Sequence, residues 1–168
     1  MYALVLGHKQ HGKGTFTGLC MSMFGITGMS SSQFALERII FPTLAPKYGY
    51  KTFEECYNDR DNHRVEWYTL IEAYNTPDAT RLATELLDNH TIYDGMRSNM
   101  EYQANIAANT FDLIFWVDAK NRKPMESPKS MSIVYDPTCM IYVDNNGPEH
   151  IMVDWIKNSS EIQLLRSA

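Results

Sequence analysis

A glycine-rich turn between a predicted strand and a predicted helix constrains this chain more than any other feature. The apolar run at residues 2–6 is typical of a buried strand, and residues 14–24 are expected to form a helix. The turn between them has the sequence Gly7-His8-Lys9-Gln10-His11-Gly12-Lys13-Gly14-Thr15. A strand that enters a helix through glycines and one lysine is the pattern of a phosphate-binding loop, so the sequence predicts a nucleotide-binding α/β protein.

The residue types in this turn suit a phosphate ligand. Glycines let backbone N–H groups curve around an anion, and the N-terminus of the following helix adds partial positive charge. We expect Lys13 to reach the β- and γ-phosphates, and the hydroxyl of Thr15, or alternatively of Thr17, to ligate Mg²⁺. The predicted nucleotide-binding residues of the turn are Gly7, His11, Gly12, Lys13, Gly14, Thr15 and Phe16.

Further apolar runs alternate with helical spacings along the chain. Strands are expected at residues 26–29, 91–93, 113–117 and 140–143, which make five with residues 2–6. One of the helices between them should start at Gln33 after a serine cap and be broken by Pro42 and Pro46. This alternation predicts an α/β fold with a five-stranded parallel sheet flanked by helices, in a single domain over residues 1–168.

Composition and charge exclude several classes of protein. The 168 residues carry a formal net charge of −5 and contain no run of eighteen apolar residues, so we expect neither a membrane span nor DNA binding over the whole surface. The first residues lack a basic stretch and a cleavage site, which argues against a signal peptide. Three cysteines without zinc spacing are typical of reduced thiols in a cytosolic protein.

A second polar cluster follows the predicted strand at residues 91–93. Asp94 comes directly after it, and Arg97 lies three residues further on. In a phosphate-loop fold the neighbouring strand end carries an acid that holds Mg²⁺ or its waters, and an arginine can offset the charge of a transferring phosphate. The sequence therefore predicts Lys13, Asp94 and Arg97 as catalytic residues, with Thr15 and Asp94 at the metal.

These two motifs resemble those of the nucleoside monophosphate kinases. Gly12-Lys13-Gly14-Thr15 matches the end of that family's phosphate loop, and Asp94-Gly95-Met96-Arg97 is similar to its DGxPR strand end without the proline. Glu101 stands where the family often has a base-reading glutamine. The resemblance implies a P-loop NTPase fold with a core at about residues 1–29 and 89–168, a helical acceptor-binding insert at about 30–88 and a short lid at about 119–132.

A closer resemblance, to small bacteriophage kinases, covers most of the chain. It is carried by Ser30-Ser31-Ser32, Tyr48-Gly49-Tyr50, His63-Arg64, Tyr74-Asn75, Gly95-Met96-Arg97, Trp116-Val117-Asp118-Ala119 and residues 55–60 and 144–147. Such kinases are described as deoxynucleoside monophosphate kinases or as 5-hydroxymethyl-deoxyuridine DNA kinases, which act on DNA in thymidine hypermodification. The resemblance implies a nucleoside triphosphate donor (ATP or another NTP or dNTP) with Mg²⁺, DNA or a deoxynucleotide as acceptor, and a location in the host cytoplasm. It leaves a homodimer open.

The two acceptors require different chemistry. A monophosphate needs cationic clamps, whereas a hydroxymethyl group benefits from a carboxylate that takes its proton. We predict Asp59 as that base, with Asp61, Glu37 and Asp94 as alternatives. The predicted acceptor-binding residues are Glu37, Arg38, Arg60, Arg64 and Glu101.

The predicted lid contains a single arginine, Arg122, which we expect to contact the donor together with Asn146. A short lid leaves the site open to a large acceptor, which favours DNA over a free dNMP. A third hypothesis, a nucleotide-binding regulatory protein without catalysis, is disfavoured because Asp94 and Arg97 accompany Lys13.

Overall fold

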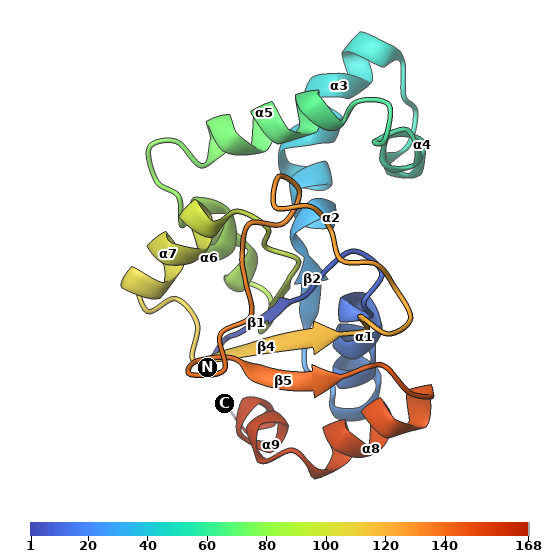
Figure 1. Cartoon of the computed structure of the whole chain (residues 1–168). Helices are drawn as coiled ribbons and strands as arrows, with labels where there is room; N and C mark the ends of the chain where they lie inside the picture. The colour runs from blue at the N-terminus through green and yellow to red at the C-terminus, as the bar shows by residue number, and fades with distance from the viewer. Residues whose placement is uncertain (168) are drawn as a thin grey trace.

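The computed structural model describes residues 1–167 and contains one parallel sheet. Its strands, in chain order, are β1 (Ala3–Leu6), β2 (Gly28–Ser30), β3 (Ile92–Asp94), β4 (Leu113–Asp118) and β5 (Ile141–Asp144). They lie in the order β2-β3-β1-β4-β5, so β1 is central and the strand after the long helical segment returns beside it (Figure 1). The predicted α/β fold with a five-stranded parallel sheet flanked by helices is confirmed.

Successive side chains of β1 point to opposite faces of the sheet, as the pleat of a strand requires, and both faces are covered. Ala3 and Val5 face a cluster built with α1 (Lys13–Phe24), α8 (Glu149–Asn158) and α9 (Ser160–Arg166). Leu4 and Leu6 face the other side, which α6 (Arg81–Leu87), α7 (Asn99–Ala107) and residues 131–140 cover. A sheet buried on both faces needs continuous apolar strands, and all four residues of β1 are fully buried.

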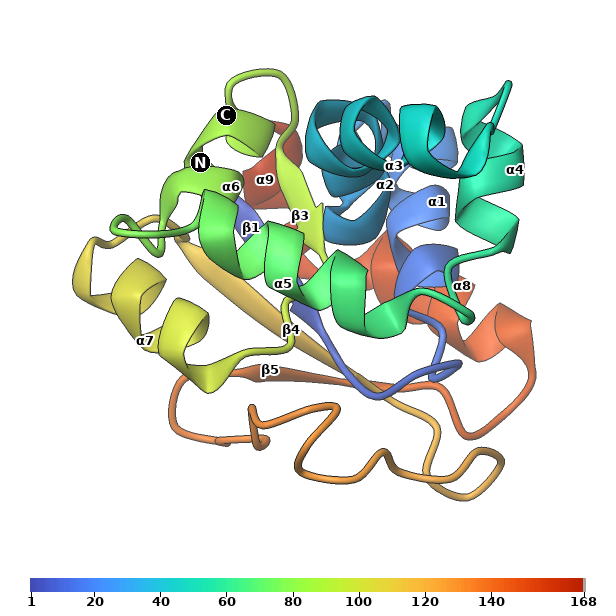
Figure 2. The ribbon, with the colours of Figure 1, turned by 90° about the horizontal axis from the view of Figure 1, so that it is seen from above.

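Between β2 and β3 the chain builds a helical layer with its own apolar cluster. It comprises α2 (Ser31–Ala35), the π-helical turn η1 (Leu36–Ile40), α3 (Phe41–Tyr48), α4 (Phe53–Asn58) and α5 (Arg64–Tyr74). Leu36, Ile40, Leu44, Cys56 and Trp67 pack together there, with Leu82 of α6 joining this cluster to the rest of the molecule. Figure 2 shows these helices lying over the ends of the strands.

Pro42 and Pro46 do not break the first helix of this layer, contrary to the sequence-based expectation. Helical backbone continues from Ser31 to Tyr48, and Pro42 stands in the first turn of α3 directly after η1. The amide of Phe41 bonds to the carbonyl of Leu36, five residues back, so the wider turn shifts the hydrogen-bond register just where proline has no N–H to offer. The helix instead ends at Gly49, whose φ is +79°.

The segment predicted as a lid, residues 119–132, contains neither helix nor strand. It leaves the end of β4, crosses beside the loop that follows β1 and continues along α7 towards β5 (Figures 1 and 2). The final helix predicted from the sequence is divided in two, because Ser159 leaves the helical conformation and caps α9 by accepting the N–H of Ile162. Among residues 1–167, none of the helices has the length and apolarity needed to cross a bilayer.

Candidate functional site

The loop at residues 7–12 joins the central strand to α1 at the carboxyl edge of the sheet, the edge where ligands bind in parallel α/β proteins. Gly7 has φ +140°, and a Cβ there would lie 2.3 Å from the carbonyl oxygen of Val117. Gly12 has φ +99°, and a Cβ would lie 2.2 Å from Nδ2 of Asn145. Glycine is therefore required at both ends, where the sequence analysis predicted it for phosphate binding.

Lys13 begins α1 and turns back over the loop. Its Nζ donates to the carbonyl of Gly7 at 2.9 Å and to that of His8 at 3.0 Å. Burial lowers the pKa of this ammonium group, the neighbouring carboxylate of Asp94 opposes that shift, and Arg97 reinforces it. The ammonium group thus lies near two carboxylates, Asp94 and Glu126, and one guanidinium at the mouth of the loop.

Asp94 ends β3, the neighbour of β1, and is 5 % exposed. Burial raises the pKa of its carboxyl group to about 6, while Lys13 and Arg97 act in the opposite direction. The chain then turns through Gly95, with φ +98°, and brings Arg97 to the same pocket. The structure therefore brings together Lys13, Asp94 and Arg97 from two neighbouring strand ends, as the two sequence motifs predicted.

The residues around Asp94 fit a magnesium ion held mainly by phosphate oxygens and water. Thr17 lies one turn after Lys13 on α1 and is 5 % exposed, and its hydroxyl lies close enough to the carboxyl group of Asp94 to lower the pKa of that group. Within residues 1–167 no group of three metal-ligating side chains exists. Mg²⁺ usually takes one or two carboxylates plus substrate phosphates, and Asp94 supplies one carboxylate at this pocket. Thr15, the predicted ligand, is exposed and lines the pocket, as Thr17 does. The hydroxyl of either residue could therefore ligate a magnesium ion there.

A pocket of about 1090 Å³ extends from the 7–12 loop to the helical layer. Its loop end is lined by Lys9, Gly12, Lys13, Gly14 and Thr15. Its far end is lined by Arg60, Arg64, Trp67 and Tyr68 of the helical layer. Asp94, Arg97 and Glu101 lie between them, so one continuous cavity connects the loop with the region expected to hold an acceptor.

Glu101 lies in the first turn of α7 on the wall of this pocket. Its Oε1 accepts a hydrogen bond of 3.0 Å from the hydroxyl of Tyr93, a fully buried side chain of β3. Burial raises the pKa of Glu101 to about 7, and the bond from Tyr93 limits that rise. The side chain can therefore present either an acid or a carboxylate to a ligand near neutral pH.

Three residues predicted for acceptor chemistry lie elsewhere. Asp59 accepts hydrogen bonds from Tyr50, Asn62 and His63, which lower the pKa of its carboxyl group and tie it into the helical layer. It does not line the pocket; Asp61, two residues on, does.

Glu37 and Arg38 lie on η1 with their side chains exposed. The guanidinium of Arg38 pairs with Glu85 of α6 at 3.2 Å, on the outside of the helical layer. The family resemblance placed these residues in the acceptor-binding insert, but only the packing of η1 decides which of its sides faces the cavity.

Some of the residues predicted to contact the donor are buried behind the 7–12 loop, and others lie at the protein surface. His11 is fully buried: its Nδ1 accepts the N–H of Ala119 at 3.0 Å and its Nε2 lies 3.3 Å from the carbonyl of Pro124. Phe16 is also fully buried and packs on Phe115, so it belongs to the core behind the loop.

Arg122 and Asn146 lie together beyond the ends of β4 and β5. The guanidinium of Arg122 donates to the carbonyl of Asn145, and the side chain of Asn146 bonds to Asp118, Asn121 and Asp144. Asn145 has a supporting role that its sequence position did not predict, because its Nδ2 donates to the carbonyl of His11 at 2.8 Å and so holds the 7–12 loop. A turn asparagine beside Asn146 gave no signal that distinguishes the two.

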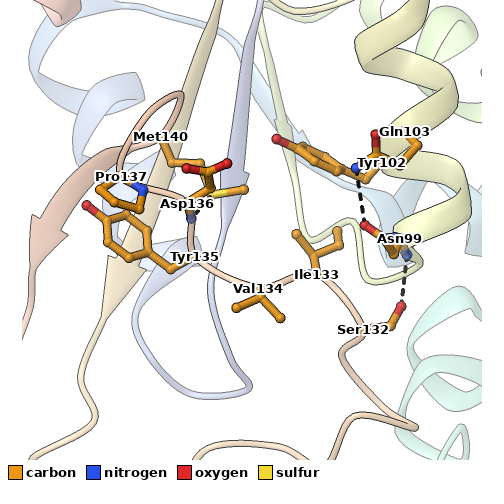
Figure 3. A pocket seen from close by; sticks show the side chains of 10 residues that line it. All are labelled: Asn99, Tyr102, Gln103, Ser132, Ile133, Val134, Tyr135, Asp136, Pro137 and Met140. Atoms are coloured by element: carbon orange, nitrogen blue, oxygen red, sulfur yellow. Dashed lines mark hydrogen bonds between the residues drawn. The ribbon is translucent and has the colours of Figure 1, made fainter.

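A second pocket, of about 400 Å³, lies between α7 and residues 132–140 (Figure 3). Asn99 donates its N–H to Ser132 at 2.8 Å across it, and Tyr102, Ile133 and Met140 supply much of its apolar surface. The carboxylate of Asp136 is its one acid, and it is used locally to bond Thr138. The first pocket, which joins the 7–12 loop to Asp94 and Arg97, is therefore the candidate functional site.

The chain matches no protein-family model and no curated protein. Among solved structures, it is similar to an unliganded sugar kinase from a Janibacter species, with 12 % identity, a TM-score of 0.44 and 96 % of each chain covered. It is also similar to a kinase candidate from Chloroflexus aurantiacus, with 17 % identity, a TM-score of 0.48, and 99 % of this chain and 96 % of that chain covered.

Proposed function

We propose that this chain is a P-loop kinase that transfers the γ-phosphate of ATP, or of another NTP or dNTP, to a deoxynucleotide-type acceptor. The observation that carries the proposal is the meeting of Lys13, Asp94 and Arg97 in one pocket that continues into the helical layer. A site that only bound a nucleotide would need neither an arginine beside the loop nor a cavity that extends past the phosphates. Phosphoryl transfer needs both, because it depends on positioning and charge neutralisation.

In this proposal, the charged and polar residues of the pocket hold the phosphates and the metal ion. N–H groups of the 7–12 loop and the ammonium of Lys13 hold the phosphates, and Arg97 offsets negative charge on the transferring group. Asp94 holds Mg²⁺ or its waters, with Thr15 or Thr17 as a hydroxyl ligand; the bound ion would neutralise charge on the β- and γ-phosphates. The acceptor oxygen bonds to the γ-phosphorus as the bond to the leaving diphosphate breaks.

The leading acceptor is the hydroxymethyl group of 5-hydroxymethyl-deoxyuridine in DNA. Exposed apolar side chains at the pocket, among them Tyr68 and Met100, offer surface on which a neighbouring base can stack. The acceptor is a neutral alcohol, so its proton must leave. Asp61 replaces Asp59 as the candidate base, because Asp61 lines the pocket and Asp59 does not.

A second candidate acceptor is a free deoxynucleoside monophosphate. Arg60, Arg64 and Arg97 all line the pocket, and such a cluster is suited to clamping an acceptor that is already an anion. This reaction requires no general base, so the two candidates differ in their dependence on Asp61.

Transfer assays with labelled ATP and Mg²⁺ separate these functions. One set of acceptors is an oligonucleotide with 5-hydroxymethyl-deoxyuridine and its thymidine counterpart, which lacks only the hydroxyl; the other set is the individual dNMPs. We expect label on the hydroxymethyl oligonucleotide alone. Label on dNMPs alone would establish the second candidate, and ATP binding without transfer to either set would favour a regulatory nucleotide-binding protein.

The base is tested by comparing Asp61→Asn with Asp59→Asn as its matched neighbour. With the DNA acceptor, Asp61→Asn should lower kcat by about 10²-fold or more, in the range that general bases contribute, while Asp59→Asn should affect mainly stability. Equal losses of kcat in both variants would remove Asp61 from the chemistry.

A further inference from the structure

Glu126 connects the 119–132 segment to the 7–12 loop. One carboxylate oxygen accepts the backbone N–H of Lys9 at 2.6 Å, and the other accepts Nη1 of Arg97 at 2.5 Å. The backbone N–H of Glu126 donates to Nδ1 of His8 at 3.1 Å. The side chain is 11 % exposed, so this carboxylate is largely enclosed by the groups of the candidate site.

The partners of Glu126 are the groups that a phosphate would use. A loop N–H and a guanidinium are typical donors to phosphate oxygens, and a carboxylate is an anion that accepts the same bonds. Burial alone would raise the pKa of Glu126, but Arg97, Lys9 and Lys13 reverse this and hold it below its usual value. The enclosed group is therefore a carboxylate ion that already satisfies part of an anion-binding site.

We propose that Glu126 competes with the donor phosphates for the Lys9 N–H and Arg97, so that nucleotide binding displaces Glu126, with the part of the 119–132 segment beside it, from the loop. The proposal rests on the proposed function, because it assumes that the 7–12 loop binds phosphates. It adds an autoinhibitory contact to that function: the segment expected to close over the donor is held against the loop by a side chain that imitates the ligand.

A plain structural ion pair would predict the opposite effect on affinity. If Glu126 only positions Arg97 and the loop for nucleotide, neutralising Glu126 would weaken binding or leave it unchanged. If Glu126 competes, neutralising it removes a charge-assisted bond that the donor has to break, and binding tightens. The sign of the change in affinity therefore separates competition from positioning, and exchange of the Glu126 amide separates displacement from the loss of a nearby negative charge alone.

The experiment measures the Kd of MgATP and of inorganic tripolyphosphate by titration calorimetry for the wild-type chain and Glu126→Gln. Glutamine keeps the shape and removes the charge, and Glu54→Gln, an exposed glutamate of α4, is the matched control. We expect Glu126→Gln to bind both probes about tenfold more tightly and Glu54→Gln to match the wild type. Thermal unfolding of each variant verifies that it is folded.

An unchanged or weaker affinity in Glu126→Gln, with normal binding by the wild type, would overturn the competition and leave the kinase proposal standing. Absence of binding in both proteins would overturn the phosphate-loop function itself, and the competition with it. Hydrogen exchange on the wild type supplies a second readout that needs no variant. MgATP should speed exchange of the Glu126 amide, which donates to His8, and slower exchange there would contradict the proposal.

Discussion

Single residues of the site differ in ionisation because their surroundings differ. Asp94 and Glu101 are both largely buried, and burial raises the pKa of the first to about 6 and of the second to about 7. Glu126 and Asp59 are held below their usual pKa by hydrogen bonds or cationic partners. Four carboxyl groups within one short chain thus have distinct roles available to them at neutral pH.

Lys13→Ala should reduce phosphoryl transfer by about 10²-fold or more without unfolding the protein. The ammonium group lies at the loop beside Asp94, and removing a cation from a phosphate site loses the charge stabilisation that the transition state needs. Transfer of label from ATP measures this effect. Lys51→Ala, which removes an exposed lysine side chain of the helical layer, is the control; full activity in Lys13→Ala would refute the assignment of the loop.

Glu101→Gln should stabilise the protein at pH 8 by about 2 kcal/mol and much less at pH 5. The folded-state pKa is near 7 and the unfolded value is near 4.5, so the native protein holds a proton that the unfolded chain has released between these values. Wild-type stability therefore falls as pH rises through this window, and a neutral glutamine removes the fall. Urea unfolding at both pH values measures it, with Glu54→Gln as control; a gain that does not depend on pH would contradict the burial of a charge.

At the level of elements, the site is made by the junctions between strands and helices. β1 passes into α1 through two glycines with positive φ, β3 passes into α7 through Gly95, and β4 leads into the segment that carries Glu126. Parallel pairing puts the carboxyl ends of β1, β3 and β4 at one edge, so three short connections converge. The helices supply support, and the connections supply the polar groups.

Gly12, the residue before α1, and Gly18, inside that helix, should respond oppositely to alanine. Gly12→Ala should abolish measurable nucleotide binding, because φ is +99° there and the added Cβ would overlap Asn145. Gly18→Ala, with open space where the added Cβ would lie, should stabilise the fold by about 0.5–1 kcal/mol through helix propensity and leave the 7–12 loop unchanged. Calorimetric titration with MgATP and thermal unfolding distinguish the pair; comparable nucleotide binding by both variants would contradict the close approach of Asn145.

At the level of the whole molecule, three apolar clusters hold different parts of the fold in place. Two pack against the two faces of the sheet and fix the loop edge, while the third holds the helical layer together around Trp67. The pocket lies where the helical layer meets the sheet edge.

Two of the three tryptophans, Trp67 and Trp155, lie in different parts of this arrangement. Trp67 lines the pocket in the helical layer, whereas Trp155 packs against Phe16 behind the loop. Acceptor binding should change the fluorescence of the wild type, and Trp67→Phe should remove most of that change while Trp155→Phe retains it. The measurement is emission during titration with the acceptor identified by the transfer assay. A signal lost only in Trp155→Phe would place the acceptor away from the helical layer.

The sequence by itself determined the α/β alternation, the five strands and the two polar motifs at their ends. These features depend on local chemistry: buried strands must be apolar, and turns with positive φ require glycine, as at Gly7 and Gly12. For the same reason Lys13, Asp94 and Arg97 could be selected together, because strand ends of a parallel sheet share one edge.

Only the tertiary structure decided which polar side chains face the pocket. The local sequence does not distinguish Asp59 from Asp61 as a candidate base. In the structure, Asp59 accepts hydrogen bonds from Tyr50, Asn62 and His63, whereas Asp61 lines the cavity. Glu126 is separated from Lys9 by 117 residues, so no local pattern could predict their bond. Long-range packing fixes these contacts. The local sequence around a loop amide carries no information about which distant carboxylate will accept its hydrogen bond.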